Sequence, residues 1–132
     1  MGQSKPFRAT ALVVEDDAMQ REMLALLLEE SEYDVIQCES AEAAELVLDR
    51  MGSTLSFLMT DVNLAGRMTG ADLAAIAHRR HPALDVVVTS GKPLNGSLPD
   101  GVKFWSKPWA ALDVLREAEF AQTARQSGSL RR

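Results

Sequence analysis

The chain has 132 residues, of which 46% are hydrophobic and 25% are charged, as in an ordinary globular domain. This length is close to that of one domain, so we expect a single hydrophobic core and no fused effector domain. The formal net charge of -5 argues against a broad nucleic-acid-binding surface, and no apolar run approaches the roughly 18 residues that a membrane span requires.

Short β-rich apolar runs alternate with longer helical patterns along the chain. In chain order, the sequence predicts strands over residues 10–14, 34–38, 56–61, 85–90 and 102–106. Helices are predicted over residues 17–30, between Ser40 and Gly52, from about Thr69 to Arg80, and from Trp109 to about Thr123. This alternation is typical of βαβ units, so the predicted fold class is α/β with a doubly wound parallel sheet.

The first predicted helix has a polar start and an apolar stripe. Asp17 precedes it and Gln20 follows three residues later, which predicts a capping box. The apolar residues at helical spacing are Met19, Met23, Leu26 and Leu27. We expect these apolar residues to lie in the core or at a docking surface.

The interval between the fourth and fifth predicted strands breaks the rhythm. It reads "GKPLNGSLPDG" and holds two Pro and three Gly in eleven residues. This composition disfavours a full helix. A helix between these two strands is therefore expected to be short or absent.

The ends of the chain and its single cysteine are typical of a cytoplasmic protein. We expect residues 1–8 to form an N-terminal extension, because they lack the apolar central region of a signal peptide. The single cysteine, Cys38, cannot form an internal disulfide. The basic residues 125–132 contain Ser and Gly without apolar periodicity, which predicts a flexible tail after a folded domain over residues 9–124.

Polar residues stand where the predicted strands end. The carboxyl ends of parallel strands meet at one edge of the sheet, where α/β proteins bind ligands. The residues there are Glu15, Asp16 and Asp17, then Asp61, then Thr89 and Ser90, and finally Ser106 and Lys107. Crowded carboxylates repel one another unless a cation neutralises them. The sequence therefore predicts a divalent cation, and oxygen ligands without His or Cys favour Mg²⁺ over zinc.

The motifs at these strand ends resemble those of a known family. In chain order they read "LVVEDD", "MTDVNL", "VVVTSG" and "FWSKPW". They are similar to the four motifs of the receiver domains of two-component response regulators, such as the chemotaxis regulators. The resemblance spans roughly Ala11 to Ala121 and implies a flavodoxin-like, five-stranded parallel sheet in the strand order 2-1-3-4-5.

The resemblance also implies a role for each polar residue at this edge. Asp61 would be the phosphoacceptor, a carboxylate nucleophile that attacks the phosphohistidine of a partner protein. Mg²⁺ would be held by Glu15, Asp16, Asp61 and the backbone carbonyl of Asn63. Lys107 would pair with the phosphoryl group. The metal and the lysine would neutralise charge as the phosphoryl group moves.

The resemblance further implies a switch made of a hydroxyl and an aromatic ring. Ser90 matches the switch hydroxyl of the family, with Thr89 as the alternative if the strand register differs by one. Phe104, three residues before Lys107, falls at the aromatic switch position. Phosphorylation would draw Ser90 and Phe104 inward and bias a two-state surface.

Two features of the loop after Asp61 depart from the family pattern. Ala65 stands where the family usually has proline, and the stretch from Asp61 to Gly70 is one residue longer than is common. We therefore expect a looser Mg²⁺ loop.

The last predicted helix carries a candidate interface. Trp109 and Phe120 are eleven residues apart, close to three helical turns. We expect their stripe to be partly exposed and to contact a partner or a second copy of the chain, as in a homodimer. Ala111, Leu115 and Ala118 would then face the core.

The function predicted from these observations is that of a stand-alone receiver. It would accept a phosphoryl group on Asp61 from a sensor histidine kinase or a histidine phosphotransfer protein. It would then bind a downstream protein or relay the phosphoryl group, without acting as an enzyme in the usual sense. No nucleic-acid or membrane partner is expected.

Two alternatives stay open. A pseudo-receiver would bind proteins without being phosphorylated, but it would usually lose the acidic pair, Asp61 or Lys107, and all of them are present. A small Mg²⁺-dependent phosphatase of the haloacid dehalogenase type would also use an aspartate nucleophile. Such enzymes usually have a second acid two residues later, where this chain has Asn63.

Overall fold

The computed structural model describes residues 8–130, the last six of them by their backbone alone. In chain order the elements are β1 (Ala9–Val14), α1 (Ala18–Glu30), β2 (Tyr33–Cys38), α2 (Ala41–Met51), the short 3-10 helix η1 (Gly52–Thr54), β3 (Leu55–Asp61), α3 (Gly70–Arg80), β4 (Asp85–Ser90), β5 (Lys103–Ser106) and α4 (Ala111–Leu130). Residues 1–7 of the predicted extension and residues 131–132 of the predicted tail lie outside the described residues. None of the described helices is long and apolar enough to cross a bilayer.

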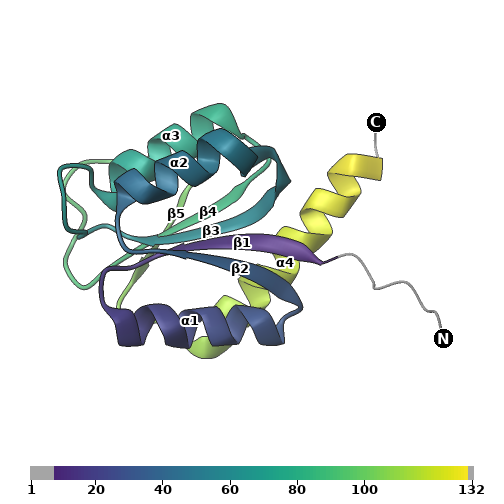
Figure 1. Cartoon of the computed structure of the whole chain (residues 1–132), viewed down its shortest axis with the longest axis horizontal. Helices are drawn as coiled ribbons and strands as arrows, with labels where there is room; N and C mark the ends of the chain where they lie inside the picture. The colour runs from purple at the N-terminus through teal and green to yellow at the C-terminus, as the bar shows by residue number, and fades with distance from the viewer. Residues whose placement is uncertain (1–7, 131–132) are drawn as a thin grey trace.

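The strands form one parallel sheet in the order β2-β1-β3-β4-β5. Helices α2 and α3 cover one face of this sheet, and α1 and α4 cover the other (Figure 1). The predicted fold class and strand order are therefore confirmed. The direction of the strand order reverses between β1 and β3, which is where doubly wound sheets bind their ligands.

The buried residues form two cores, one on each face of the sheet. The single core expected from the chain length is therefore wrong, because the sheet separates the two sets of buried side chains. Strand β3 is buried along its whole length, because it has strands on both sides and helices on both faces. Side chains alternate between the faces along each strand. Leu58 and Val88 therefore belong to the core under α2 and α3, while Met59 and Val87 belong to the core against α1 and α4.

Side-chain caps begin the helices that lead away from the carboxyl edge of the sheet. Asp17 Oδ1 accepts a hydrogen bond from the backbone N–H of Gln20 at 2.9 Å, so the predicted cap is present. The Gln20 side chain does not complete a capping box, because it binds Lys107 instead. Thr69 and Asp72 form a full capping box at the start of α3.

Most of the apolar stripe predicted for α1 lies in solvent, whereas Leu27 is partly buried and packs against the core. Met19 is 78% exposed, Met23 is 51% exposed and Leu26 is 63% exposed. The residues of α1 that face the sheet include Leu24 and Leu28. A core position is therefore wrong for Met19, Met23 and Leu26, and the alternative of a docking surface stays a prediction. This helix has apolar residues on more than one face, so spacing alone could not select the face that packs.

The last helix, α4, differs from its prediction at both ends. It begins at Ala111, so Trp109 precedes it. It continues to Leu130, so the predicted end near Thr123 is wrong and residues 125–130 are helical. No proline interrupts this stretch, and Ala124, Arg125 and Gln126 are good helix formers that carry the helix past Thr123. Its core positions are Val114, Ala118 and Ala121, whereas Ala111 is exposed.

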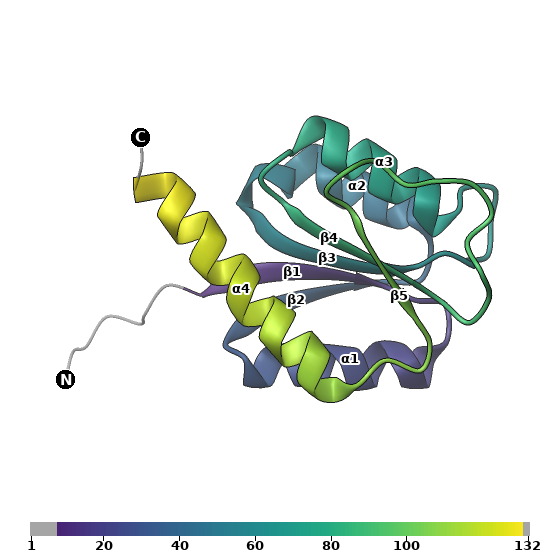
Figure 2. The ribbon, with the colours of Figure 1, turned by 180° about the vertical axis from the view of Figure 1, so that it is seen from behind.

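No helix forms between β4 and β5 over residues 91–102, and this prediction is confirmed. The segment runs as an irregular loop from the end of β4 to the start of β5 (Figure 2). Leu98 and Val102 pack with Phe104 against the core under α2 and α3. Apolar side chains from a loop and the edge strand β5 therefore cover part of this face in place of a helix.

A charged cluster joins α4 to the amino end of β4 and β5. Lys103 forms ion pairs with Asp85 at 3.3 Å and with Glu117 of α4. The Lys103 ammonium also lies 4.5 Å from the centre of the Phe120 ring. Burial, with Glu117 close by, raises the pKa of Asp85 to about 7, although Lys103 opposes this change.

Because the pKa of Asp85 is raised, we expect the stability of the folded protein to decrease as pH rises. Protonation of Asp85 favours the folded state, so its contribution is fully present below about pH 4 and is lost as pH rises through about 7. Between pH 5 and 8 we expect the free energy of unfolding of the wild type to fall by about 1–2 kcal/mol relative to Asp85→Asn. Urea titrations of both proteins across this range would measure the difference. Parallel pH profiles would contradict the prediction.

Candidate functional site

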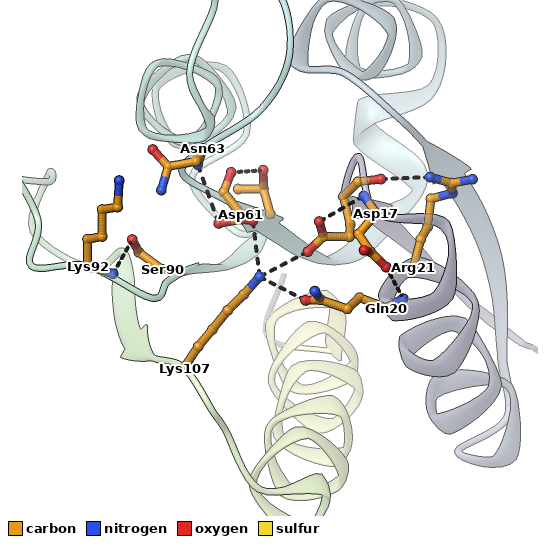
Figure 3. A network of polar contacts seen from close by, with 10 residues as sticks. Asp17, Gln20, Arg21, Asp61, Asn63, Ser90, Lys92 and Lys107 are labelled. Carbon is orange, nitrogen blue, oxygen red and sulfur yellow. Dashed lines mark hydrogen bonds and ion pairs between the residues drawn. The ribbon is translucent and has the colours of Figure 1, made fainter.

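Asp61 lies at the carboxyl edge of the sheet, at the end of β3, and is 8% exposed. The backbone beside it is fixed, because the Val62 N–H donates to the Thr89 carbonyl at 2.8 Å. Asp61 Oδ1 accepts a hydrogen bond from the Asn63 N–H at 3.3 Å, and Oδ2 accepts one from Lys107 Nζ at 3.0 Å (Figure 3). The carboxylate is therefore held in one orientation, with a cation on one side.

Glu15 follows β1 and is buried beside Asp61. Its Oε2 accepts a hydrogen bond from the Asp17 N–H at 3.0 Å, and its Oε1 accepts one from Lys107 at 3.1 Å. Arg21 donates to the Glu15 carbonyl at 2.8 Å and fixes the backbone of this turn. Burial raises the pKa of Glu15, and the negative charge of Asp61 adds to the effect, while Asp17 and Lys107 oppose it. Burial thus disfavours the charged form of Glu15, and the positive charge of Lys107 stabilises that form.

Glu15, Asp16 and Asp61 form a cluster of carboxylates. Each contributes one oxygen, and these oxygens all lie within 4.8 Å of one another. Glu15 and Asp61 are buried, whereas Asp16 is exposed. A cluster built from carboxylate oxygens alone suits a hard cation that keeps part of its water shell. The residues present therefore fit Mg²⁺.

Lys107 joins the two buried acids to α1. Besides Asp61 and Glu15, its ammonium donates to Gln20 Oε1 at 2.9 Å. Burial alone would lower the pKa of Lys107, but its hydrogen bonds and charge pairing with Asp61 and Glu15 outweigh this, and the pKa is raised. The ammonium therefore stays charged where it neutralises both carboxylates.

Ser90 and Thr89 are both buried at the end of β4, but strand alternation places them on opposite faces. Val88 pairs with Phe104 and both pack against the core under α2 and α3, so Ser90 lies on the same face as Phe104. The Ser90 Oγ accepts a hydrogen bond from the Lys92 N–H at 3.1 Å. Ser90, and not Thr89, therefore shares a face of the sheet with Phe104.

The longer loop after Asp61 is anchored rather than loose. Glu42, on α2, accepts hydrogen bonds from the backbone N–H groups of Arg67 and Met68 at 3.0 and 2.9 Å. These bonds hold the loop that carries Asn63 and Ala65. The structure therefore gives no support to the looser loop expected from the sequence.

Sequence patterns did not predict the contacts of three residues that support this site: Gln20, Arg21 and Glu42. Gln20 was noted only for its spacing from Asp17, which says nothing of its bond to Lys107. The partners of Arg21 and Glu42 depend on how the loops fold. Their local sequence carried no signal for these contacts.

Trp109 and Phe120 do not form the single helical stripe that their spacing predicted. Trp109 is half-buried and lines a groove of about 570 Å³ together with Met23, Leu27 and Lys107, among others. Phe120 is 54% exposed and contacts Lys103 instead. A contact of either residue with a partner or a second copy stays a prediction.

The sheet order and the acidic edge place the chain in the flavodoxin-like class, with a site suited to a divalent cation and a phosphoryl group. Within that class the chain belongs to the response regulator receiver domain family, which matches residues 11–105. The membership makes it a component of two-component signalling. A comparison with curated protein sequences found no match.

Solved structures of receiver domains have the same fold. A response regulator receiver domain protein from Clostridium thermocellum is 19% identical, with a TM-score of 0.77 over 89% of this chain and 97% of that one. A response regulator receiver protein from Sinorhizobium medicae is 22% identical, with a TM-score of 0.78 over 89% and 97%. The receiver domain of the hybrid histidine kinase CckA is 25% identical, with a TM-score of 0.74 over 86% and 98%.

Proposed function

We propose that this receiver accepts a phosphoryl group on Asp61 from the phosphohistidine of a histidine kinase or a histidine phosphotransfer protein. The observation that carries the proposal is the contact of Asp61 with Lys107 at 3.0 Å, next to a carboxylate cluster that fits Mg²⁺. The phosphorylated form would bind a downstream protein or pass the phosphoryl group onward.

Each side chain at the site would have a separate role in the transfer. An Asp61 oxygen attacks phosphorus, and the new O–P bond forms as the P–N bond to the donor histidine breaks. Lys107 stays protonated and neutralises a phosphoryl oxygen. Glu15, Asp16, Asp61 and the Asn63 carbonyl would hold Mg²⁺, which when bound supplies further charge neutralisation. Asp61 is held in place by Asn63 and Lys107 before the donor arrives.

The surface beside the site supports a protein as the phosphoryl donor. Met19 and Met23 are exposed on α1, and Met23 lines the groove that reaches Lys107. Exposed apolar side chains next to a reactive group suit a contact with another protein. Ser90 and Phe104 would then carry the effect of phosphorylation to β5, because they share one face of the sheet.

Tryptophan fluorescence tests this proposal directly. Trp105 and Trp109 stand on either side of Lys107 in the sequence and are half-buried, so their emission should respond to the site. We expect a saturable change when Mg²⁺ and then beryllofluoride, a phosphoryl mimic, are added to the wild type. The change should require Mg²⁺ and should be lost in Asp61→Asn.

Intact mass after incubation with acetyl phosphate provides a second readout. A phosphoryl adduct on the wild type and none on Asp61→Asn would agree with the proposal. Neither a fluorescence change nor an adduct would reject it in favour of a protein-binding pseudo-receiver. Steady turnover of small phosphate esters would instead support the phosphatase alternative.

A further inference from the structure

The loop between β3 and α3, residues 62–69, is fixed at its base by backbone hydrogen bonds. Val62 N–H donates to the Thr89 carbonyl at 2.8 Å, and Gly70 N–H donates to the Val62 carbonyl at 2.9 Å. These bonds tie both ends of the loop to the carboxyl edge of the sheet. They do not determine where its middle lies.

Glu42 supplies a second anchor, at the far side of the loop. Its Oε2 accepts hydrogen bonds from two consecutive backbone N–H groups, those of Arg67 and Met68, at 3.0 and 2.9 Å. The bond from Met68 is the main cause of the lowered pKa of Glu42, and the bond and charge of Arg67 add to it. The side chain therefore acts as a charged acceptor that joins α2 to the loop.

Gly66 shows how closely the loop approaches this carboxylate. Its φ is +100°, a conformation that side-chain-bearing residues rarely adopt. A Cβ at this position would lie 2.8 Å from Glu42 Oε1. The contact therefore depends on a glycine at this point in the loop.

The stretch between the two anchors borders the carboxylate cluster. Asn63 N–H donates to Asp61 Oδ1 at 3.3 Å, and Ala65 lines a groove of about 540 Å³ together with Asp16. We propose that Glu42 is a positioning residue for the Mg²⁺ site: by holding residues 67 and 68, it keeps the Asn63 backbone beside Asp61 and Ala65 at the groove that Asp16 lines. This inference rests on the proposed function and adds a residue to it.

The test is the Mg²⁺ affinity of matched variants, measured by tryptophan fluorescence without any phosphoryl donor. Glu42→Ala should bind Mg²⁺ about tenfold more weakly than the wild type, as is common when a partner of a metal ligand is lost. Glu42→Gln keeps an acceptor oxygen without the charge and should stay within about threefold of the wild type. Glu39→Ala removes an exposed charge from the groove that Asp16 lines, and should also stay within this limit.

A thermal unfolding curve in EDTA shows whether each variant is folded, and Gly66→Ala provides an independent test. The added methyl group should push the Glu42 carboxylate away and reproduce the weaker Mg²⁺ binding. Wild-type affinity in both Glu42→Ala and Gly66→Ala would overturn the inference and leave the proposed function intact. An equal loss in Glu39→Ala would assign the effect to charge and also overturn it. No Mg²⁺ binding by the wild type would reject the proposed function and this inference together.

Discussion

Gly70→Ala is expected to destabilise the folded domain by about 3 kcal/mol or more. A Cβ on this residue would lie 1.8 Å from the Asp61 carbonyl oxygen and 2.9 Å from Thr60 Oγ1. The backbone cannot easily yield, because Gly70 N–H binds the Val62 carbonyl and Val62 N–H binds the Thr89 carbonyl. In an ordinary helix position the same change would stabilise, since Ala has the higher helix propensity.

Urea denaturation of this variant beside Gly91→Ala would measure the effect. Gly91 lies in the loop after β4, and a Cβ there would meet nothing within 4 Å, so the control should keep wild-type stability. The Gly70 variant should also lose the beryllofluoride response, because relief of the clash must shift the Asp61 peptide. Equal stability of the two variants would show that the start of α3 tolerates a side chain.

Lys107→Met is expected to lower the stability of the metal-free protein by about 3 kcal/mol. The side chains of Glu15 and Asp61 are 8% and 10% exposed, and both pair with the Lys107 ammonium. Without that cation, two mostly buried carboxylates repel each other where little water can screen their charges. Transfer from acetyl phosphate should also slow by about 100-fold, because a charge near the transferred group is lost.

Mg²⁺ should partly restore the stability of this variant, because the ion would neutralise the same carboxylates. We therefore expect Mg²⁺ to raise the melting temperature of Lys107→Met by more than that of the wild type. Lys92→Met removes an exposed charge at the same edge of the sheet and serves as the control. Wild-type stability of Lys107→Met in EDTA would contradict the role of Lys107 as the partner of both acids.

The fold and the composition of the site could be predicted from the sequence because both follow from local patterns. Alternating strands and helices defined the sheet, and parallel strands bring their carboxyl ends to one edge. That rule alone brought Asp61, Glu15 and Lys107 together, and the structure places them within hydrogen-bond distance. The absence of a helix before β5 could also be predicted, from the Pro and Gly content of that segment.

The remaining features depend on contacts between segments far apart in the sequence. Glu42 binds backbone groups 25 and 26 residues away, and Gln20 binds Lys107 across 87 residues. No local pattern encodes such pairs. For a related reason, the spacing of Met19 and its neighbours on α1 could not decide between the core and a docking surface. When a helix is apolar on several sides, the neighbouring sheet selects the face that is buried.

The segment between β4 and β5 has a consequence for local unfolding. Within the described structure, its own backbone amides are bonded only at Lys92 and Val102, at 3.1 Å in each case. Segments with so few internal bonds open without global unfolding. Amide hydrogen exchange should therefore be faster here than in the strands, and each opening would uncover Phe104 while the rest of the sheet stays paired. Strand β4, which ends at Ser90, is therefore followed by a segment of low local stability.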